Sequence, residues 1–240
     1  MSIEFRNAPY SFDGIEFDGA LAFTPGEPRP GVLVVHGWEG RSDAQDKVAL
    51  RLASWGYNAF CVDLYGDGKR GSTPDECNAL MTPLISNRPL LRERLLHTVS
   101  AVAAAPQIDA SRIAAIGFCF GGLCMLDLAR ANAPLRAVAS FHGMLTAPAS
   151  LPPPARIDTK IIVFHGWDDP MAPPQDVVAL AVELSAANAD WQLHAYGATL
   201  HAFMAEGLNA PERGLQYNAR SARRAWTALQ THLSEAFAAP

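Results

Sequence analysis

Short runs of consecutive apolar residues recur along the chain, and segments with apolar positions at helical spacing lie between them. Strands that are apolar throughout are typical of parallel sheets that helices cover on both faces. Strands are expected at residues 31–36, 58–64, 112–116, 135–141, 160–164 and 191–196. Helices are expected at 42–56, from 74 with breaks near Pro83 and Pro89, and at 90–105, 123–130, 173–188 and 217–237. This alternation predicts an α/β protein with a doubly wound, mostly parallel sheet, whose active crevice lies at the carboxyl ends of the strands.

The N-terminal segment departs from this rhythm. Residues 2–24 predict two strands joined at Asp13-Gly14, a strong turn signal, so an antiparallel hairpin is expected at one edge of the sheet. The Pro-rich segment 148–154 is expected to be a surface connection, because the strand pattern resumes beyond it. With no internal repeat, residues 1–240 are expected to form a single domain.

Composition narrows the classes of partner. Hydrophobic residues make up 49% and charged residues 18% of the chain, which is ordinary for a globular protein. The net charge is −5 and there is no basic run, which argues against a nucleic-acid partner. No apolar stretch is long enough to cross a membrane and no signal-peptide pattern is present, so a cytoplasmic protein, monomeric or weakly dimeric, is expected. The four cysteines lack a C-x-x-C spacing, which argues for free thiols.

The segment 117–122, Gly-Phe-Cys-Phe-Gly-Gly, lies between an expected strand and an expected helix. A strand, a sharp turn flanked by glycines and a helix are the setting of a nucleophile elbow, in which Cys119 would replace the usual serine. The N-terminus of the helix favours the thiolate form of such a cysteine. The alternative is a buried structural cysteine in a Gly-rich turn. An acid and a histidine that follow in the right order decide between these readings.

Candidates for both follow at strand ends. Asp168 and Asp169 come after the strand 160–164, and Asp169 is preferred because it directly precedes the Pro170 turn. His201 lies in the loop after the last strand, so the order of nucleophile, acid and histidine is that of α/β-hydrolases. His36, His142 and His165 also end strands and are expected to line the crevice. His36 and His165 with a carboxylate could bind a metal, but no H-E-x-x-H pair supports this, and no metal is expected.

An acyl-transfer site also needs donors for the oxyanion. The backbone N–H of Phe120, which follows the cysteine, is one candidate, and the N–H of Trp38 in the loop after the strand 31–36 is the other. Trp38 could instead be a surface cap over the sheet.

The chain resembles the dienelactone hydrolase family nearly from end to end. The resemblance is carried by Val34-Val35-His36-x-x-x-Gly40, Asp63-Leu64-Tyr65-Gly66, residues 112–122, Phe141-His142-Gly143, Gly166-x-x-Asp169-Pro170 and Tyr196-Gly197-x-x-x-x-His201-Ala202-Phe203. It implies an α/β-hydrolase fold, a triad of Cys119, His201 and Asp169, and oxyanion amides at Trp38 and Phe120. It further implies a carboxymethylenebutenolidase-like activity on enol-lactones or related small carboxylic esters, without an added cofactor.

One departure from the family pattern matters. Many relatives carry a glutamate near the thiol at the position of Gly37, whereas the glutamate of this chain is Glu39. Either Glu39 swings in to take its place, or the thiol is activated without it. Glu39, His36, Tyr65 and His142 are therefore candidates for thiol activation or for the pocket. No arginine matches those that bind a substrate carboxylate in the family; Arg41, Arg88 and Arg92 are candidates.

The expected function is thus hydrolysis of small carboxylic esters or lactones through an acyl-enzyme on Cys119. A general carboxylesterase or thioesterase would use the same chemistry. A ligand-binding protein that keeps the fold without turnover is the rival from another class, and Gly37 is the feature that favours it. A redox-sensing thiol at Cys119 is compatible with catalysis. The natural substrate is left open.

Overall fold

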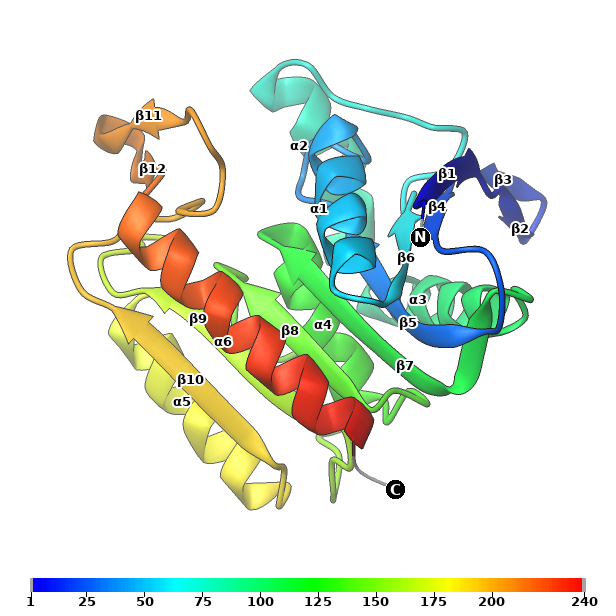
Figure 1. The fold of residues 1–240 in the computed structure, drawn as a ribbon. Helices are drawn as coiled ribbons and strands as arrows, with labels where there is room; N and C mark the ends of the chain where they lie inside the picture. Colours follow the sequence, from blue (N-terminus) through cyan, green and yellow to red (C-terminus); the bar gives the residue numbers. More distant parts are fainter. Residues whose placement is uncertain (1, 239–240) are drawn as a thin grey trace.

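An eight-stranded sheet forms the centre of the computed structural model, which describes residues 2–238 (Figure 1). In spatial order its strands are β1 (Glu4–Asn7), β4 (Ala20–Phe23), β6 (Asn58–Val62), β5 (Arg29–Val35), β7 (Ile108–Phe118), β8 (Ala137–Phe141), β9 (Lys160–Gly166) and β10 (Trp191–Tyr196). The six strands from β6 to β10 are parallel, and β1 and β4 add an antiparallel edge. The predicted doubly wound, mostly parallel sheet is therefore confirmed.

Helices cover both faces of this sheet (Figure 1). One face carries α1 (Asp43–Ser54) and α6 (Ala219–Ala238), and the other carries α2 (Pro74–Ile85), α3 (Arg88–Ala103), α4 (Phe120–Arg130) and α5 (Pro174–Ala186). Alternate residues of β5 serve the two layers: Leu33 and Val35 pack toward α3 and α4, and Val32 and Val34 pack toward α1 and α6. Burial on both faces explains the continuous apolar runs in the sequence.

The N-terminal region contains four short strands where two were expected. The turn at Asp13-Gly14 joins β2 (Tyr10–Phe12) to β3 (Ile15–Phe17) in a separate antiparallel ribbon, while β1 pairs with β4 at the edge of the main sheet. Pro83 does not break its helix as expected but lies inside α2. Its ring removes the helical hydrogen bond to the carbonyl of Ala79, and α2 ends two residues later at Ile85.

A small element between β10 and α6 escaped the sequence analysis. It consists of β11 (Asn209–Ala210), the 3₁₀ turn η1 (Pro211–Arg213) and β12 (Leu215–Gln216). Strands of two residues leave no periodic signal. Among the described residues, no helix combines the length and the hydropathy needed to cross a bilayer.

Candidate active site

The carboxyl ends of β5 and β7 meet at the point where the strand order reverses, and Cys119 lies there. Its backbone is strained, with φ 54° and ψ −113°, and its N–H donates to the carbonyl oxygen of Phe141 at 3.0 Å. A Cβ on Gly121 would lie 2.5 Å from the carbonyl oxygen of Val35, so only glycine lets α4 approach β5 this closely. The half-buried thiol is thus held at a sharp turn between strand and helix.

Asp169 and His201 form a buried pair at the same edge of the sheet. Nδ1 of His201 donates to Oδ2 of Asp169 at 2.7 Å, and Oδ1 of Asp169 accepts from the N–H of Met171 at 2.8 Å. Both side chains are almost fully buried. Asp168 lies exposed instead, so the structure brings Asp169 and not Asp168 to the imidazole.

The position of His201 depends on the small element that the sequence did not reveal. The N–H of His201 donates to the carbonyl oxygen of Gly214 at 3.0 Å, and its carbonyl accepts from the N–H of Gln216 at 3.1 Å. His201 also forms an isolated β-bridge with Leu215. The η1–β12 segment therefore fixes the backbone on which the imidazole stands.

The electrostatics favour a protonated His201. Burial opposes its charge, but the hydrogen bond to Asp169 and the neighbouring thiol of Cys119 outweigh burial and raise the pKa of His201 to about 10. Its Nε2 is buried and faces the thiol of Cys119, which interacts with it although the geometry is not that of a regular hydrogen bond. A charged imidazole beside Cys119 is the arrangement that stabilises a thiolate.

His142 packs against this imidazole. The ring centroids of His142 and His201 lie 5.0 Å apart at an interplanar angle of 69°, and Phe203 contacts His142 on another side at 5.4 Å. Burial and then the charge of His201 lower the pKa of His142 well below its usual range. His142 is therefore a neutral wall of the crevice.

His36 holds the loop after β5. Its Nε2 accepts the N–H of Leu64 at 3.1 Å, so the ring hydrogen is on Nδ1, which donates to the carbonyl oxygen of Gly37 at 2.6 Å. Burial lowers the pKa of His36, in keeping with a neutral ring. Both ring nitrogens are occupied by backbone partners, so His36 links the β5 and β6 loops.

Two backbone amides near Cys119 have no partner. Neither the N–H of Trp38 nor that of Phe120, the first residue of α4, donates to another residue of the described part of the chain. Phe120 follows the cysteine directly, and Trp38 lies in the loop after β5, the strand next to β7. Free N–H groups in such positions are available to an oxyanion.

Comparison with known proteins shows to which family the chain belongs. The family model described as dienelactone hydrolase family matches residues 17–237. The chain belongs to the dienelactone hydrolase family. A Yersinia pestis protein provisionally named carboxymethylenebutenolidase is 30% identical over 209 residues, covering 83% of this chain and 75% of the relative.

Solved structures give the same result for this dienelactone hydrolase family member. The protein called m3DLH is 33% identical with a TM-score of 0.90, covering 98% of this chain and 99% of its own. A dienelactone hydrolase-like promiscuous phosphotriesterase from metagenomic libraries is 32% identical with a TM-score of 0.92, covering 99% and 100%. An α/β-hydrolase from a deep-sea metagenome, at 19% identity and a TM-score of 0.63, shares the fold. The fold is therefore that of α/β-hydrolases.

Glu39 occupies the space that a side chain at position 37 would need. A Cβ added to Gly37 would lie 2.7 Å from Oε2 of Glu39. Burial raises the pKa of Glu39, and the nearby Arg70 opposes this shift. The carboxyl group of Glu39 therefore lies directly over Gly37.

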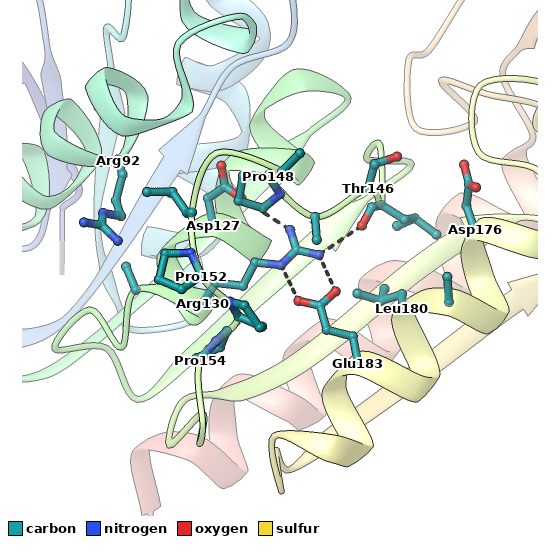
Figure 2. Close-up of a pocket in the computed structure, with 17 residues that line it drawn as sticks. Arg92, Asp127, Arg130, Thr146, Pro148, Pro152, Pro154, Asp176, Leu180 and Glu183 are labelled. Atoms are coloured by element: carbon teal, nitrogen blue, oxygen red, sulfur yellow. Dashed lines mark hydrogen bonds and ion pairs between the residues drawn. The ribbon is translucent and has the colours of Figure 1, made fainter.

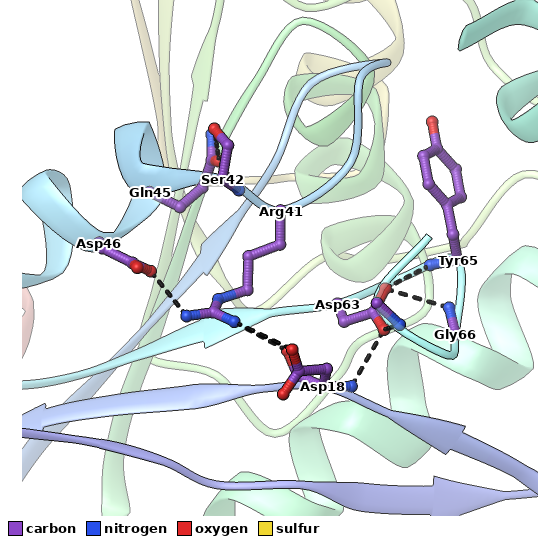
Figure 3. A network of polar contacts seen from close by, with 9 residues as sticks. Asp18, Arg41, Ser42, Gln45, Asp46, Asp63, Tyr65 and Gly66 are labelled. Carbon is purple, nitrogen blue, oxygen red and sulfur yellow. Dashed lines mark hydrogen bonds and ion pairs between the residues drawn. The ribbon is translucent and has the colours of Figure 1, made fainter. Parts of the chain in front are cut away.

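Two of the three candidate arginines are paired with carboxylates of the protein. Arg41 pairs with Asp46 at 2.9 Å and with Asp18 at 3.5 Å (Figure 3). Arg88 binds both oxygens of the buried Asp127, at 2.6 and 2.5 Å. Arg92 makes no ion pair with a described residue.

Arg92 lines a cavity of about 500 Å³ at the far end of α4, beneath the Pro-rich segment 148–154 (Figure 2). Neither Cys119 nor His201 lines this cavity. Among residues 2–238, no group of three or more His, Cys, Asp or Glu side chains is arranged to hold a metal ion.

Proposed function

We propose that this protein hydrolyses small carboxylic esters or lactones through an acyl-enzyme on Cys119. The observation that carries the proposal is the buried hydrogen bond of 2.7 Å between His201 and Asp169, with the imidazole next to a cysteine on a strained elbow. Each of the three residues then has a role that its surroundings support. Cys119 is the nucleophile, His201 moves the proton and Asp169 orients the imidazole.

In the first half-reaction the Cys119 thiolate adds to the acyl carbon. A C–S bond forms, and the carbonyl electrons move to the oxygen, which accepts the N–H groups of Trp38 and Phe120. Collapse of this adduct breaks the bond to the leaving oxygen, which takes the proton of the His201 imidazolium. A thioester on Cys119 and a neutral imidazole remain.

Water completes the cycle. The neutral His201 removes a proton from water as the oxygen adds to the thioester carbon, and the same two amides hold the second oxyanion. Expulsion of the Cys119 sulfur releases the carboxylic acid and restores the thiolate and imidazolium. Ester and water are thus converted to acid and alcohol, and a lactone gives a single hydroxy acid or its keto form.

Glu39 has a supporting part in this proposal. Its carboxyl group fills the space over Gly37, and burial raises its pKa, which suits a group that exchanges a proton with the thiol at neutral pH. The residue thus serves as the thiol-activating glutamate from a different position in the loop.

Mass spectrometry of the intact protein tests the proposal. A slow p-nitrophenyl ester is expected to add one acyl group to the wild-type protein and none to Cys119→Ala, which should also lose ester hydrolysis. Cys77→Ala, at a buried cysteine outside the triad, is the matched control and should acylate normally. Undiminished hydrolysis by Cys119→Ala would contradict the assignment. A ligand that raises Tm while no activated ester is turned over would favour the binding protein.

The same site supports a second substrate class. The relative at 32% identity is a promiscuous phosphotriesterase, and a phosphoryl oxygen could accept the same two amides as an acyl oxygen. Cys119 would displace an aryloxide from phosphorus, and water would then release the phosphate diester from sulfur. An aryl dialkyl phosphate assayed beside the matched acyl ester measures this activity, and Cys119→Ala should abolish it.

A further inference from the structure

Tyr65 lies between the two backbone segments that carry the free amides. Its hydroxyl donates to the carbonyl oxygen of Trp38 at 2.8 Å. Its ring is nearly parallel to that of Phe120, at 13° with the centroids 6.0 Å apart. Burial, followed by the nearby Cys124 and Glu39, raises the pKa of Tyr65, so the hydroxyl keeps the proton that it donates. Tyr65 therefore contacts both sides of the proposed oxyanion hole.

The turn that carries Tyr65 is held tightly (Figure 3). The Asp63 carboxylate is fully buried, and its Oδ1 accepts the N–H groups of Tyr65 and Gly66, each at 3.0 Å. Its Oδ2 accepts those of Asp18 and Gly68, also at 3.0 Å. Four backbone donors thus replace a cationic partner for this carboxylate. The Tyr65 hydroxyl is a donor on a rigid support.

The loop that it reaches has no such support of its own. Residues 37–40 belong to no helix or strand. The Nδ1–H of His36 holds the carbonyl of Gly37, and the hydroxyl of Tyr65 holds the carbonyl of Trp38. Because each peptide unit is planar, the His36 bond holds the plane that contains the Trp38 N–H, and the Tyr65 bond holds the next plane, so that the backbone at Trp38 is restrained on both sides.

We propose that Tyr65 is a positioning residue that keeps the Trp38 amide aimed at the oxyanion. This rests on the proposed ester hydrolysis, because the oxyanion exists only in that reaction. Oxyanion donors work by being fixed before the charge develops, and a donor free to turn loses much of its effect. The ring of Tyr65 packs beside Phe120, and its hydroxyl holds the carbonyl of Trp38. Removal of the hydroxyl alone therefore separates the positioning of the loop from the packing of the ring.

Tyr65→Phe is the test, with Tyr10→Phe as its matched control. Tyr10 is another buried phenol in the same region, whose hydroxyl donates to the carbonyl oxygen of Asp63 at 2.5 Å and does not contact Trp38. With p-nitrophenyl acetate, Tyr65→Phe is expected to lower kcat by about tenfold to a hundredfold, with KM changed by less than about threefold. Tyr10→Phe should leave both constants near those of the wild type.

Alkylation of Cys119 by iodoacetamide gives a second readout. This displacement at saturated carbon forms no oxyanion, so Tyr65→Phe should alkylate at the wild-type rate although ester hydrolysis is slow. Alkylation that slows in parallel with hydrolysis would show that Tyr65 acts on the thiol and would overturn the proposal. Equal loss of kcat in Tyr10→Phe would make the effect structural. Failure of the proposed function is distinct: wild type and Cys119→Ala would then hydrolyse esters equally poorly.

Discussion

At the N-terminal end of helix α4 several polar groups lack partners within the protein, whereas at its C-terminal end they are paired. The N–H groups of Trp38 and Phe120 make no hydrogen bond to a described residue, and the buried Nε2 of His201 has only the thiol of Cys119 beside it among the described residues. The last turns of this eleven-residue helix contain a buried network. In it Asp127 accepts from Arg88 and Arg130, and Arg130 also holds both oxygens of Glu183 at 2.7 and 2.8 Å (Figure 2).

The difference separates function from architecture. A polar group without a partner in the protein can accept one from outside, and leaving it unpaired costs about 1–3 kcal/mol where it is buried. The Asp127 network has its partners already, and it ties α4 to α3 and α5. Substitutions at the first end should therefore lower the rate most, and those at the second end should lower the stability and leave the rate unchanged.

The largest effect is expected at the reactive end. Asp169→Asn keeps the shape of the side chain but removes the charge that orients and protonates His201. By analogy with serine triads, kcat should fall by about 10³–10⁴-fold, measured by ester hydrolysis. Asp168→Asn is the neighbouring exposed control and should behave as the wild type. Equal losses in both variants would refute the role given to Asp169.

The second effect is expected at the paired end. Asp127→Asn leaves Arg88 and Arg130 buried beside a neutral side chain. Breaking a buried pair in this way should cost about 3 kcal/mol, which lowers Tm by about 6–12 °C in a protein of this size. The folded variant should retain its kcat at 25 °C. Thermal melting and an ester assay on the same sample measure the two effects. A large loss of kcat with Tm unchanged would erase the contrast between the ends.

The sequence predicted the reactive end better than its supports. Continuous apolar strands required a covered parallel sheet, and glycines around Cys119 required a close turn, so the position of the elbow followed from local rules. His201 could be found because it follows the last strand. The segment that holds its backbone, 209–216, could not, because strands of two residues carry no period.

Glu39 shows the same limit. That its carboxyl group lies over Gly37 depends on the path of a loop of irregular backbone, which neither composition nor spacing encodes. The helix break expected near Pro83 falls just beyond this residue, because helix boundaries can be read from sequence patterns only to within a few residues. Residues on regular elements were thus predictable, and side-chain directions in loops were not.

The charge of His201 predicts a pH effect of intermediate size. With the pKa of His201 raised to about 10, the imidazolium that is proposed to protonate the leaving oxygen persists through neutral pH and disappears as the pH rises through about 10. Ester kcat/KM should therefore hold to about pH 9 and fall roughly tenfold by about pH 11. The same shift stabilises the folded state fully below pH 6.5, and this contribution is lost as pH rises through about 10. A fall in kcat/KM that begins near neutral pH would contradict the pairing of His201 with Asp169.

The smallest effect is expected from Glu39, and two variants reach it by different routes. Glu39→Gln removes the ionisable group, whereas Gly37→Ala places a Cβ 2.7 Å from Oε2 and pushes the intact carboxyl group aside. If this group activates the thiol, both variants should slow the alkylation of Cys119 by iodoacetamide about three- to tenfold at neutral pH. Tyr65→Phe should not, so alkylation separates the activation of the thiol from the stabilisation of the oxyanion within one loop. Alkylation at the wild-type rate in both variants would show that Glu39 only lines the pocket and that His201 alone activates the thiol.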